Sequence, residues 1–369
     1  MPRRRRAAPA PALPHDPVLL ALAAAFLALL AIYLSIPRGA APPPPAAPTE
    51  LEPPAEAAPG IYLFCTWNVE NLYDDRDDPR LRDTAEDYFG THPEVLDRKL
   101  DLLARALLLQ GEGRGPDILA VVEVENRRAA EMLRDALNAK LPPGLHYTGI
   151  AQRDNPTGRR FGPAVLTRLA VLDARTRANA GGRRILEAHL SAGGPELVVL
   201  ASHWTSRLRD GDEPKRAAYA DALYDSYRGL ATLDPEVDLI LCGDFNDEPD
   251  DPSLTDHLHA TADPSAVVPG GDYLLDLMAG RDPRAFGTYY HAGNWSILDH
   301  IVASPGLLDP AGWRVDPDSL RVEAPSSLRS GAAGYPRRFG NANNRNPRGP
   351  SDHFALTVKL RLSTAAEGP

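Results

Sequence analysis

Two polar side chains close an apolar stretch in the segment LILCGDFNDEP, residues 239–249. Asp244 and Asn246 are two positions apart, so in a strand they face the same side, while Phe245 faces the other side and packs. Gly243 allows the backbone to kink or to approach a neighbouring segment just before the pair. A simple turn at the end of a strand is the alternative. The segment predicts a carboxylate and a carboxamide presented together into one site.

The same pattern recurs along the chain, because other polar side chains also stand where apolar stretches end. They are Asn68 in WNVEN, Glu123 in VVEVEN, His203 in SHW, Asp299 in LDH, and Asp352 and His353 in SDH. Ligands bind beyond strand ends in α/β sheets, so these side chains are expected to converge. Such a site holds oxygen ligands of the kind that Mg²⁺ takes, and it lacks a nucleophilic Ser or Cys. This chemistry suits hydrolysis of a phosphate ester by an activated water.

The six motifs WNVEN, EVEN, SHW, GDFN, LDH and SDH, in this order, resemble the endonuclease/exonuclease/phosphatase superfamily. That superfamily includes pancreatic deoxyribonuclease, apurinic endonucleases, neutral sphingomyelinases and inositol polyphosphate phosphatases. The resemblance covers residues 61–362. It implies an α/β fold, a four-layered sandwich with two packed, mainly antiparallel β-sheets and outer helices. It also implies an enzyme that uses a divalent cation, Mg²⁺ or alternatively Mn²⁺ or Ca²⁺.

The resemblance further implies a role for each motif residue. Metal binding is implied for Asn68, Glu123 and Asp352, although the family usually has Gln before this Glu and the chain has Val122. Catalytic roles are implied for His203, Asp244, Asn246, Asp299 and His353. Among these, His203 contacts the phosphate, Asp244 and Asn246 orient the attacking water, and Asp299 and His353 form a dyad. The sequence leaves open whether His353 or Asp244 is the general base.

Two groups of arginines add candidates for substrate binding. Arg207 and Arg216 follow the SHW motif, in a stretch that resembles bacterial members of the superfamily, and arginine suits bidentate phosphate contact. A solvated loop and helix start is the alternative. The second group precedes His353 and could focus a polyanionic substrate, with a disordered loop as the alternative. Its members are Arg337, Arg338, Arg345 and Arg348.

Periodicity and composition predict the elements that must position these residues. Strands are expected at 61–68, 116–126, 162–172, 183–190, 196–204, 239–246, 297–304 and 353–362, and helices at 93–110, 128–140 and 214–232. Residues 247–295 and 305–350 are predicted to be long polar connections. Early alternation of strands and helices, followed by strand-rich stretches, fits one α/β domain with two packed sheets.

The first 59 residues have a different composition from the rest. Residues 1–17 hold Arg3–Arg6, residues 18–36 are apolar and uncharged, and residues 37–59 are rich in Pro and Ala. Nineteen helical residues span about 28 Å, close to the bilayer core. We therefore expect a cytoplasmic N-terminus, a transmembrane signal anchor and a semi-rigid linker, with a cleaved signal peptide as the alternative. The domain then spans 60–362, followed by a short tail at 363–369.

Charge and cysteine content narrow the class of function. The chain has a net charge of −10, and residues 1–59 carry +1, which leaves −11 on residues 60–369. This charge argues against non-specific wrapping of nucleic acid, but it does not exclude an enzyme that meets a phosphate through a metal ion. Cys65 and Cys242 lie in apolar stretches and are expected to be buried thiols, with one disulfide as the alternative.

These observations predict a membrane-anchored phosphoesterase whose catalytic domain lies outside the cytoplasm, or is secreted if the anchor is cleaved. A nuclease or phosphodiesterase is the first expectation, because deoxyribonuclease-like members share the His203 position. A lipid or inositol phosphate hydrolase is the alternative, which the anchor would suit. A non-catalytic binding module is the third hypothesis, and the complete motif set argues against it. The expected partners are nucleic acid or another phosphodiester and the membrane; no protein partner is implied.

Overall fold

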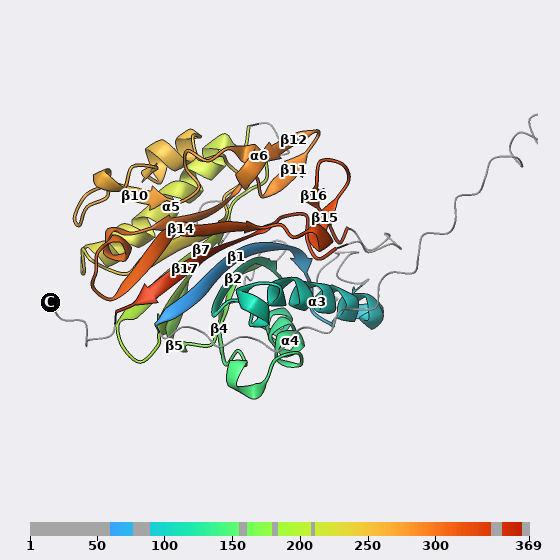
Figure 1. Cartoon of the computed structure of the whole chain (residues 1–369). Helices are drawn as coiled ribbons and strands as arrows, with labels where there is room; N and C mark the ends of the chain where they lie inside the picture. The colour runs from blue at the N-terminus through green and yellow to red at the C-terminus, as the bar shows by residue number, and fades with distance from the viewer. Residues whose placement is uncertain are drawn as a thin grey trace, which may run out of the picture. The chain divides into compact units, whose positions relative to one another are not determined.

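The computed structural model describes residues 60–76, 89–154, 161–178, 184–207, 211–340 and 349–363 (Figure 1). The chain divides into two units, Met1–Leu51 and Glu52–Pro369. The predicted N-terminal segments 1–17, 18–36 and 37–59, and the tail beyond residue 363, lie outside the described residues. Within the described ranges, no helix has the length and apolar character needed to cross a membrane.

A six-stranded sheet has the strand order β14-β17-β1-β2-β4-β3. Its strands are β1 (Ile61–Leu72), β2 (Ile118–Val124), β3 (Gly149–Gln152), β4 (Gly162–Thr167), β14 (Trp313–Glu323) and β17 (Ala355–Leu362). β1 and β2 run parallel, and the other neighbours are antiparallel. The first and last of these strands in the chain, β1 and β17, are therefore neighbours, with Ile61 opposite Arg361.

A seven-stranded sheet has the order β5-β6-β7-β8-β13-β10-β9. Its strands are β5 (Ala170–Ala178), β6 (Arg184–Ser191), β7 (Glu196–His203), β8 (Leu239–Asp244), β9 (Ala260–Thr261), β10 (Leu274–Asp276) and β13 (Asp299–Ala303). β7 pairs with β8, and β9 with β10, in parallel; the other neighbours are antiparallel. Two hairpins stand apart from the large sheets. They are β11 (Tyr289–His291) with β12 (Asn294–Ser296), and β15 (Arg329–Ser330) with β16 (Tyr335–Pro336).

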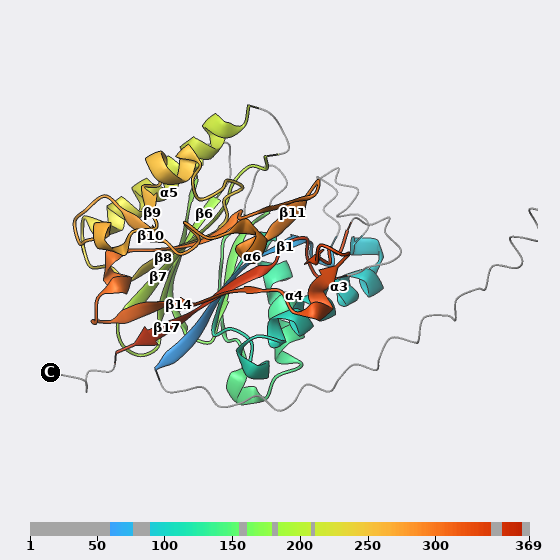
Figure 2. The same ribbon diagram turned by 45° about the horizontal axis from the view of Figure 1, so that its top comes forward.

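The two large sheets pack face to face, and helices cover their outer faces (Figures 1 and 2). Helices α3 (Pro93–Leu108) and α4 (Arg127–Asn138) cover the six-stranded sheet, and α5 (Glu213–Ala231) covers the seven-stranded sheet. Strand periodicity produces this layering: Phe64 faces the space between the sheets, whereas its neighbour Cys65 faces α3. The predicted sandwich of two mainly antiparallel sheets with outer helices is confirmed.

Local sequence explains where the helices begin. Pro93 occupies the first turn of α3, where its missing N–H costs nothing. The Asn126 side chain accepts a hydrogen bond from Ala129 N and caps α4. Each predicted helix is present with ends that differ by one or two residues. Cys65 and Cys242 are buried free thiols, as expected, and the alternative disulfide is absent.

The prediction of long polar connections was wrong in part. The range 305–350 contains β14, an 11-residue edge strand, and the range 247–295 contains β9, β10, β11 and the short helix α6 (Pro283–Phe286). The sequence of β14, WRVDPDSLRVE, is typical of a loop because it has few apolar side chains and includes Pro317. An edge position tolerates proline and solvated side chains. The expected strand 162–172 is two strands, β4 and β5, and the short β3 was not predicted.

Candidate active site

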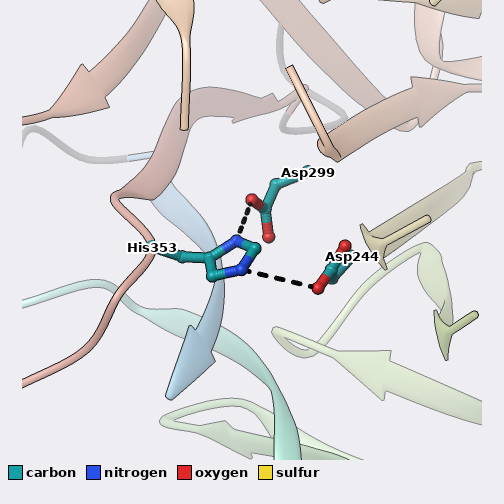
Figure 3. A group of neighbouring side chains, drawn as sticks. All are labelled: Asp244, Asp299 and His353. Atoms are coloured by element: carbon teal, nitrogen blue, oxygen red, sulfur yellow. Dashed lines mark hydrogen bonds and ion pairs between the residues drawn. The ribbon is translucent and has the colours of Figure 1, made fainter. Parts of the chain in front are cut away.

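Three predicted site residues meet at the ends of strands β8, β13 and β17 (Figure 3). β8 and β13 pair with Asp244 opposite Asp299, so the strand register sets these carboxylates side by side. His353 Nδ1 lies 2.7 Å from Asp299 Oδ2, and His353 Nε2 lies 3.7 Å from Asp244 Oδ2. The His353 ring therefore stands between two buried carboxylates. Trp67 Nε1 donates to the His353 carbonyl at 3.0 Å, which fixes the backbone of His353 against β1.

Asn68 joins the two large sheets through its carboxamide. Its Nδ2 lies 2.9 Å from Asp244 Oδ2, on the seven-stranded sheet, and 3.2 Å from Glu123 Oε1, on the neighbouring strand of its own sheet. One amide group thus bridges a predicted catalytic carboxylate and a predicted metal ligand. The Asn68 carbonyl accepts from Ser351 Oγ at 2.6 Å, and this hydroxyl also accepts from His353 N, so the start of the last strand is held to the same residue.

Glu123 is fixed by an irregularity at the end of β1. The β1–β2 register shifts between Asn68 and Leu72, and Glu70 and Asn71 have φ values of 52° and 55°. This left-handed bulge turns Asn71 N–H toward Glu123 Oε2, which accepts it at 2.7 Å. Glu123 itself has a φ of 65°. Such backbone strain in residues other than glycine clusters at functional sites.

His203 and Asn246 lie on either side of Asp244. β7 runs parallel to β8 with His203 opposite Asp244, and His203 Nε2 is 3.5 Å from Asp244 Oδ2. Asn246 has a φ of 55°, and its N–H donates to Asp244 Oδ1 at 3.0 Å. Phe245 is fully buried between the rings of Trp204 and His300, as its place in the strand predicts.

Gly243 explains how the seven-stranded sheet brings Asp244 so close to β7. Its φ is 132°, and a Cβ at this position would lie 1.9 Å from the Ser202 carbonyl oxygen. Glycine is therefore required by a close backbone approach, as the sequence predicted. The approach is part of the β7–β8 pairing that aligns His203 with Asp244.

A cavity of about 480 Å³ opens over these residues. Most of the predicted site residues line it: Asn68, Glu123, His203, Arg207, Asp244, Asn246, Asp352 and His353. Asp299 does not line it, because it lies behind His353 and is fully buried. Tyr289, which the sequence analysis did not identify, also lines the cavity, and its ring centroid is 4.8 Å from that of His353.

The family can be assigned from the sequence of this domain. Residues 64–362 match the model described as Endonuclease/Exonuclease/phosphatase family. The chain belongs to this family. It is therefore a metal-dependent phosphoesterase, and the resemblance drawn from the six motifs is confirmed.

Solved structures agree with the fold of this family member. TDP2 from Caenorhabditis elegans is 17% identical with a TM-score of 0.50, covering 82% of this chain and 98% of that one. An endonuclease/exonuclease/phosphatase family protein from Bacteroides thetaiotaomicron is 16% identical with a TM-score of 0.52, covering 84% and 100%. D. rerio TDP2 complexed with single strand DNA product is 15% identical with a TM-score of 0.51, covering 82% and 99%. No curated protein sequence matched the chain.

The site of this family member is electrostatically suited to a cation. Burial raises the pKa of Asp244 to about 7, and Asp299 and Glu123 add to the rise while His353 and Asn68 oppose it. Burial, together with Asp352, also raises the pKa of Glu123. For His353, burial acts to lower the pKa, but Asp299 and Asp244 outweigh it and raise the pKa well above its usual value. Crowded, buried carboxylates hold protons because their charges repel.

The donor set fits a divalent cation. Glu123 and Asp352 supply carboxylate oxygens at the cavity, which are hard ligands of the kind that Mg²⁺ prefers. Asn68 instead directs its amide nitrogen to Glu123 and Asp244, and its Oδ1 accepts from Glu70 N at 2.9 Å, so the structure favours a positioning role for Asn68 over the predicted role as a ligand. Asp299 Oδ1 is buried and has no hydrogen-bond partner among the described residues, although Oδ2 is used by His353. A cation would offset the repulsion among these carboxylates, so the residues present fit the metal dependence of the family.

The two arginines after the SHW motif have different positions. Arg207 lines the cavity, and its guanidinium lies within 4 Å of three carboxylates: 3.8 Å from Asp247, 3.7 Å from Glu248 and 3.4 Å from Asp251. Arg216 is buried in α5, with Nε 2.7 Å from Asp247 Oδ1, and does not line this cavity. The structure does not bring Arg216 to the predicted phosphate site, because α5 directs its side chain to Asp247.

Further residues that support the site were missed. Lys99 is fully buried on α3, and its Nζ donates to the carbonyls of Glu70 and Pro350. Burial lowers the pKa of Lys99 to about 8, although Glu70 opposes this. A lysine among Leu96, Leu100 and Leu103 on the apolar face of a helix is a signal that could have identified it. Arg345 and Arg348, from the second arginine group, lie outside the described residues.

Proposed function

We propose that the chain is a divalent-metal-dependent phosphodiesterase that hydrolyses nucleic acid by attack of an activated water. The observation that carries this proposal is the His353–Asp299 hydrogen bond, with Asp244, Glu123 and Asn68 facing it across one cavity. Mg²⁺, Mn²⁺ or Ca²⁺ are the candidate cations. Glu123 and Asp352 are the residues that would hold one, and Asn68 would position Glu123 through the hydrogen bond from its Nδ2. When bound, the cation neutralises negative charge that develops on the phosphate.

The geometry favours separate roles for His353 and Asp244. Asp299 holds the His353 ring through Nδ1 and directs Nε2 to Asp244 and the cavity. Burial acts to lower the pKa of His353, but its two carboxylate neighbours outweigh burial and raise it. The raised pKa favours the protonated ring, which can donate to a phosphate oxygen. Asp244, whose pKa is about 7, is then the acceptor for the proton of the attacking water. His203 and Asn246, beside Asp244, contact the phosphate.

Nucleic acid is the favoured substrate for two reasons. His203 occupies the position that deoxyribonuclease-like members share, and one structural neighbour is described in complex with a single strand DNA product. The alternative, a lipid or inositol phosphate, is favoured by the charge-free segment 18–36. This segment and Arg3–Arg6 also support the proposal that the domain is anchored to a membrane and lies outside the cytoplasm.

The test is cleavage of plasmid and linear DNA by the purified chain with Mg²⁺ or Mn²⁺, beside His353→Ala and Glu123→Gln. Wild type should cut, and excess chelator should stop cutting. His353→Ala should lower kcat by about 10²-fold or more, and Glu123→Gln should need a higher cation concentration for half-maximal rate. Full wild-type activity in chelator would contradict the metal mechanism. Hydrolysis of lipid or inositol phosphates in the absence of DNA cleavage would favour the alternative substrate.

A further inference from the structure

We propose that Arg338 forms a second phosphate subsite, which binds the phosphate next to the reacting one in a nucleic acid strand. This inference rests on the proposed function and names a substrate-binding residue outside the family motifs. The fold fixes Arg338 beside Asp352, a residue that lines the cavity.

A single buried carboxylate anchors the segment that carries Arg338. Glu70 is 5% exposed, and it accepts hydrogen bonds from Arg338 Nε at 3.1 Å, Phe339 N at 2.6 Å and Gly340 N at 3.1 Å. The left-handed bulge at Glu70 and Asn71 is what turns this side chain toward residues 338–340. The guanidinium is thus held before substrate arrives, so little side-chain entropy is lost on binding.

The contacts with Glu70 place the Arg338 guanidinium next to a carboxylate of the active site. Arg338 Nη2 lies 3.0 Å from Glu70 Oε1 and 3.3 Å from Asp352 Oδ2, and Asp352 lines the catalytic cavity. More than half of the Arg338 side chain is exposed. Asp352 is also a predicted cation ligand, so a bound cation would attract the same carboxylate that Arg338 contacts. The exposed guanidinium can then donate to a phosphate oxygen of the substrate.

Aromatic contacts hold this rim in place. The Tyr335 ring stacks on Tyr290 with centroids 5.4 Å apart and planes 10° from parallel. Tyr290 belongs to the hairpin β11–β12, from which Tyr289 and His291 line the cavity. Tyr335, three residues before Arg338, therefore packs against the side of the hairpin that faces away from the cavity, and this contact holds the chain just before Arg338.

Two comparisons within the chain single out Arg338. Arg207 lines the cavity, but three carboxylates lie within 4 Å of its guanidinium, whereas Arg338 contacts two, Glu70 and Asp352. Arg337, the neighbour of Arg338, is exposed and donates to the Ser327 carbonyl at 3.3 Å, away from Asp352. A guanidinium suits the planar oxygen pair of a phosphodiester. In a nucleic acid strand, one phosphate can bind at the catalytic residues while the next phosphate binds at Arg338.

The test compares a substrate with one phosphate and a substrate with many. The purified full-length chain, Arg338→Ala and Arg337→Ala are assayed on bis(p-nitrophenyl) phosphate and on a short oligothymidylate, with Mg²⁺. At a saturating Mg²⁺ concentration, which removes any effect through Asp352, Arg338→Ala should raise KM for the oligothymidylate about tenfold, the loss of one charge-assisted contact. Under the same condition, kcat/KM for bis(p-nitrophenyl) phosphate should stay within about twofold of wild type. Arg337→Ala removes the same charge one residue away and should change neither. Arg338→Lys should restore part of the affinity.

Binding is measured separately from turnover. In a His353→Ala background with Mg²⁺, fluorescence anisotropy of a labelled oligothymidylate should give a Kd about tenfold higher for Arg338→Ala. Equal weakening by Arg337→Ala would show a general charge effect and overturn the subsite. An equal loss on both substrates would move Arg338 to the reacting phosphate and also overturn the subsite. Thermal unfolding of Arg338→Ala, compared with wild type, identifies a loss caused by misfolding.

The two proposals fail in different ways. A wild-type enzyme that hydrolyses bis(p-nitrophenyl) phosphate and leaves the oligothymidylate intact overturns the nucleic acid proposal, and the subsite with it. A wild-type enzyme that cuts both, with Arg338→Ala indistinguishable from it in KM and Kd, overturns the subsite alone.

Discussion

Two Asp–His pairs differ in their surroundings: one faces the cavity, and the other is fully buried. Asp299 holds His353 at 2.7 Å, and the ring faces the catalytic cavity. Asp276 holds His300 at 2.9 Å, but both side chains are fully buried and His300 Nε2 donates to the Asp247 carbonyl at 3.0 Å. The same pair of residue types thus faces the candidate active site in one place and is enclosed by packing in the other.

This contrast gives a matched test of the dyad. Asp299→Asn keeps the volume but removes the charge that orients His353, so kcat for phosphodiester hydrolysis should fall about 10²- to 10⁴-fold with little change in KM. Steady-state kinetics measures both. Asp276→Asn is the control, and it should lower the melting temperature while leaving kcat within a few-fold of wild type. Similar kcat losses in the two variants would argue against a special role for Asp299.

Strand-end motifs could be found from sequence, but their supporting residues could not. The i, i+2 spacing of Asp244 and Asn246 follows from strand geometry, and the ordered motifs identified the other cavity residues. Glu70 and Arg338 are 268 positions apart and meet only through the β1 bulge. Arg216 was assigned to the phosphate because it is an arginine near His203, whereas the direction of α5 decides what its side chain contacts.

At the scale of elements, the approach of β8 to β7 depends on one residue. Gly243→Ala would set a Cβ 1.9 Å from the Ser202 carbonyl oxygen, at a φ of 132° that alanine rarely adopts. We expect a loss of roughly 2–4 kcal/mol in the free energy of unfolding, measured by urea denaturation, because the strands must separate. Gly162→Ala in β4 is the control, since its Cβ would meet no described atom within 4 Å. Equal losses in both variants would contradict this reasoning.

The junction between β8 and β14 gives a prediction for pH. Asp238 precedes β8, and its Oδ2 accepts from Trp313 N at 2.8 Å, at the start of β14. Burial raises the pKa of Asp238 to about 7, with Asp309 adding and Trp313 opposing. The folded state thus holds a proton that the unfolded state loses above about pH 4, so this contribution to stability falls as pH rises from 4 to 7.

Asp238→Asn removes this titration and keeps an acceptor for Trp313. Its melting temperature should match wild type near pH 4 and exceed it near pH 8, with the difference growing between these values. Asp225→Asn, at an exposed position on α5, is the control and should follow the wild-type curve at every pH. A constant offset between Asp238→Asn and wild type would show that the pKa of Asp238 is not raised.

Elements with strong periodicity were predicted, and those defined by their partners were not. α3 and α4 carry apolar residues at helical spacing, and the ends of α3, α4 and α5 differ from the predicted ends by one or two residues. β14 owes its strand structure to β17, its partner at the edge of the sheet. Short strands such as β9 and β10 likewise exist through pairing, and two or three residues carry too little pattern to predict.

At the scale of the whole molecule, the described domain contains the complete motif set, and the first 59 residues lie outside it. Removing residues 1–36 should therefore leave kcat unchanged and move the protein from the membrane fraction to the soluble fraction, as measured by immunoblotting and hydrolysis assays. If the full chain is already soluble and its N-terminus begins beyond residue 36, the segment is a cleaved signal peptide. Membrane association that survives the deletion would contradict the proposed anchor.

The pairing of β1 with β17 has a consequence for how the protein is made. A ribosome releases the chain from its N-terminus, so β1 cannot complete its pairing with β17 until residues up to Arg361 have emerged. His353 arrives in the same final stretch, after every other cavity residue. A partly synthesised chain thus has neither a closed six-stranded sheet nor a dyad. The cavity is therefore complete only when the last strand of the six-stranded sheet has been made, so activity of this site would arise only once β17 has been synthesised.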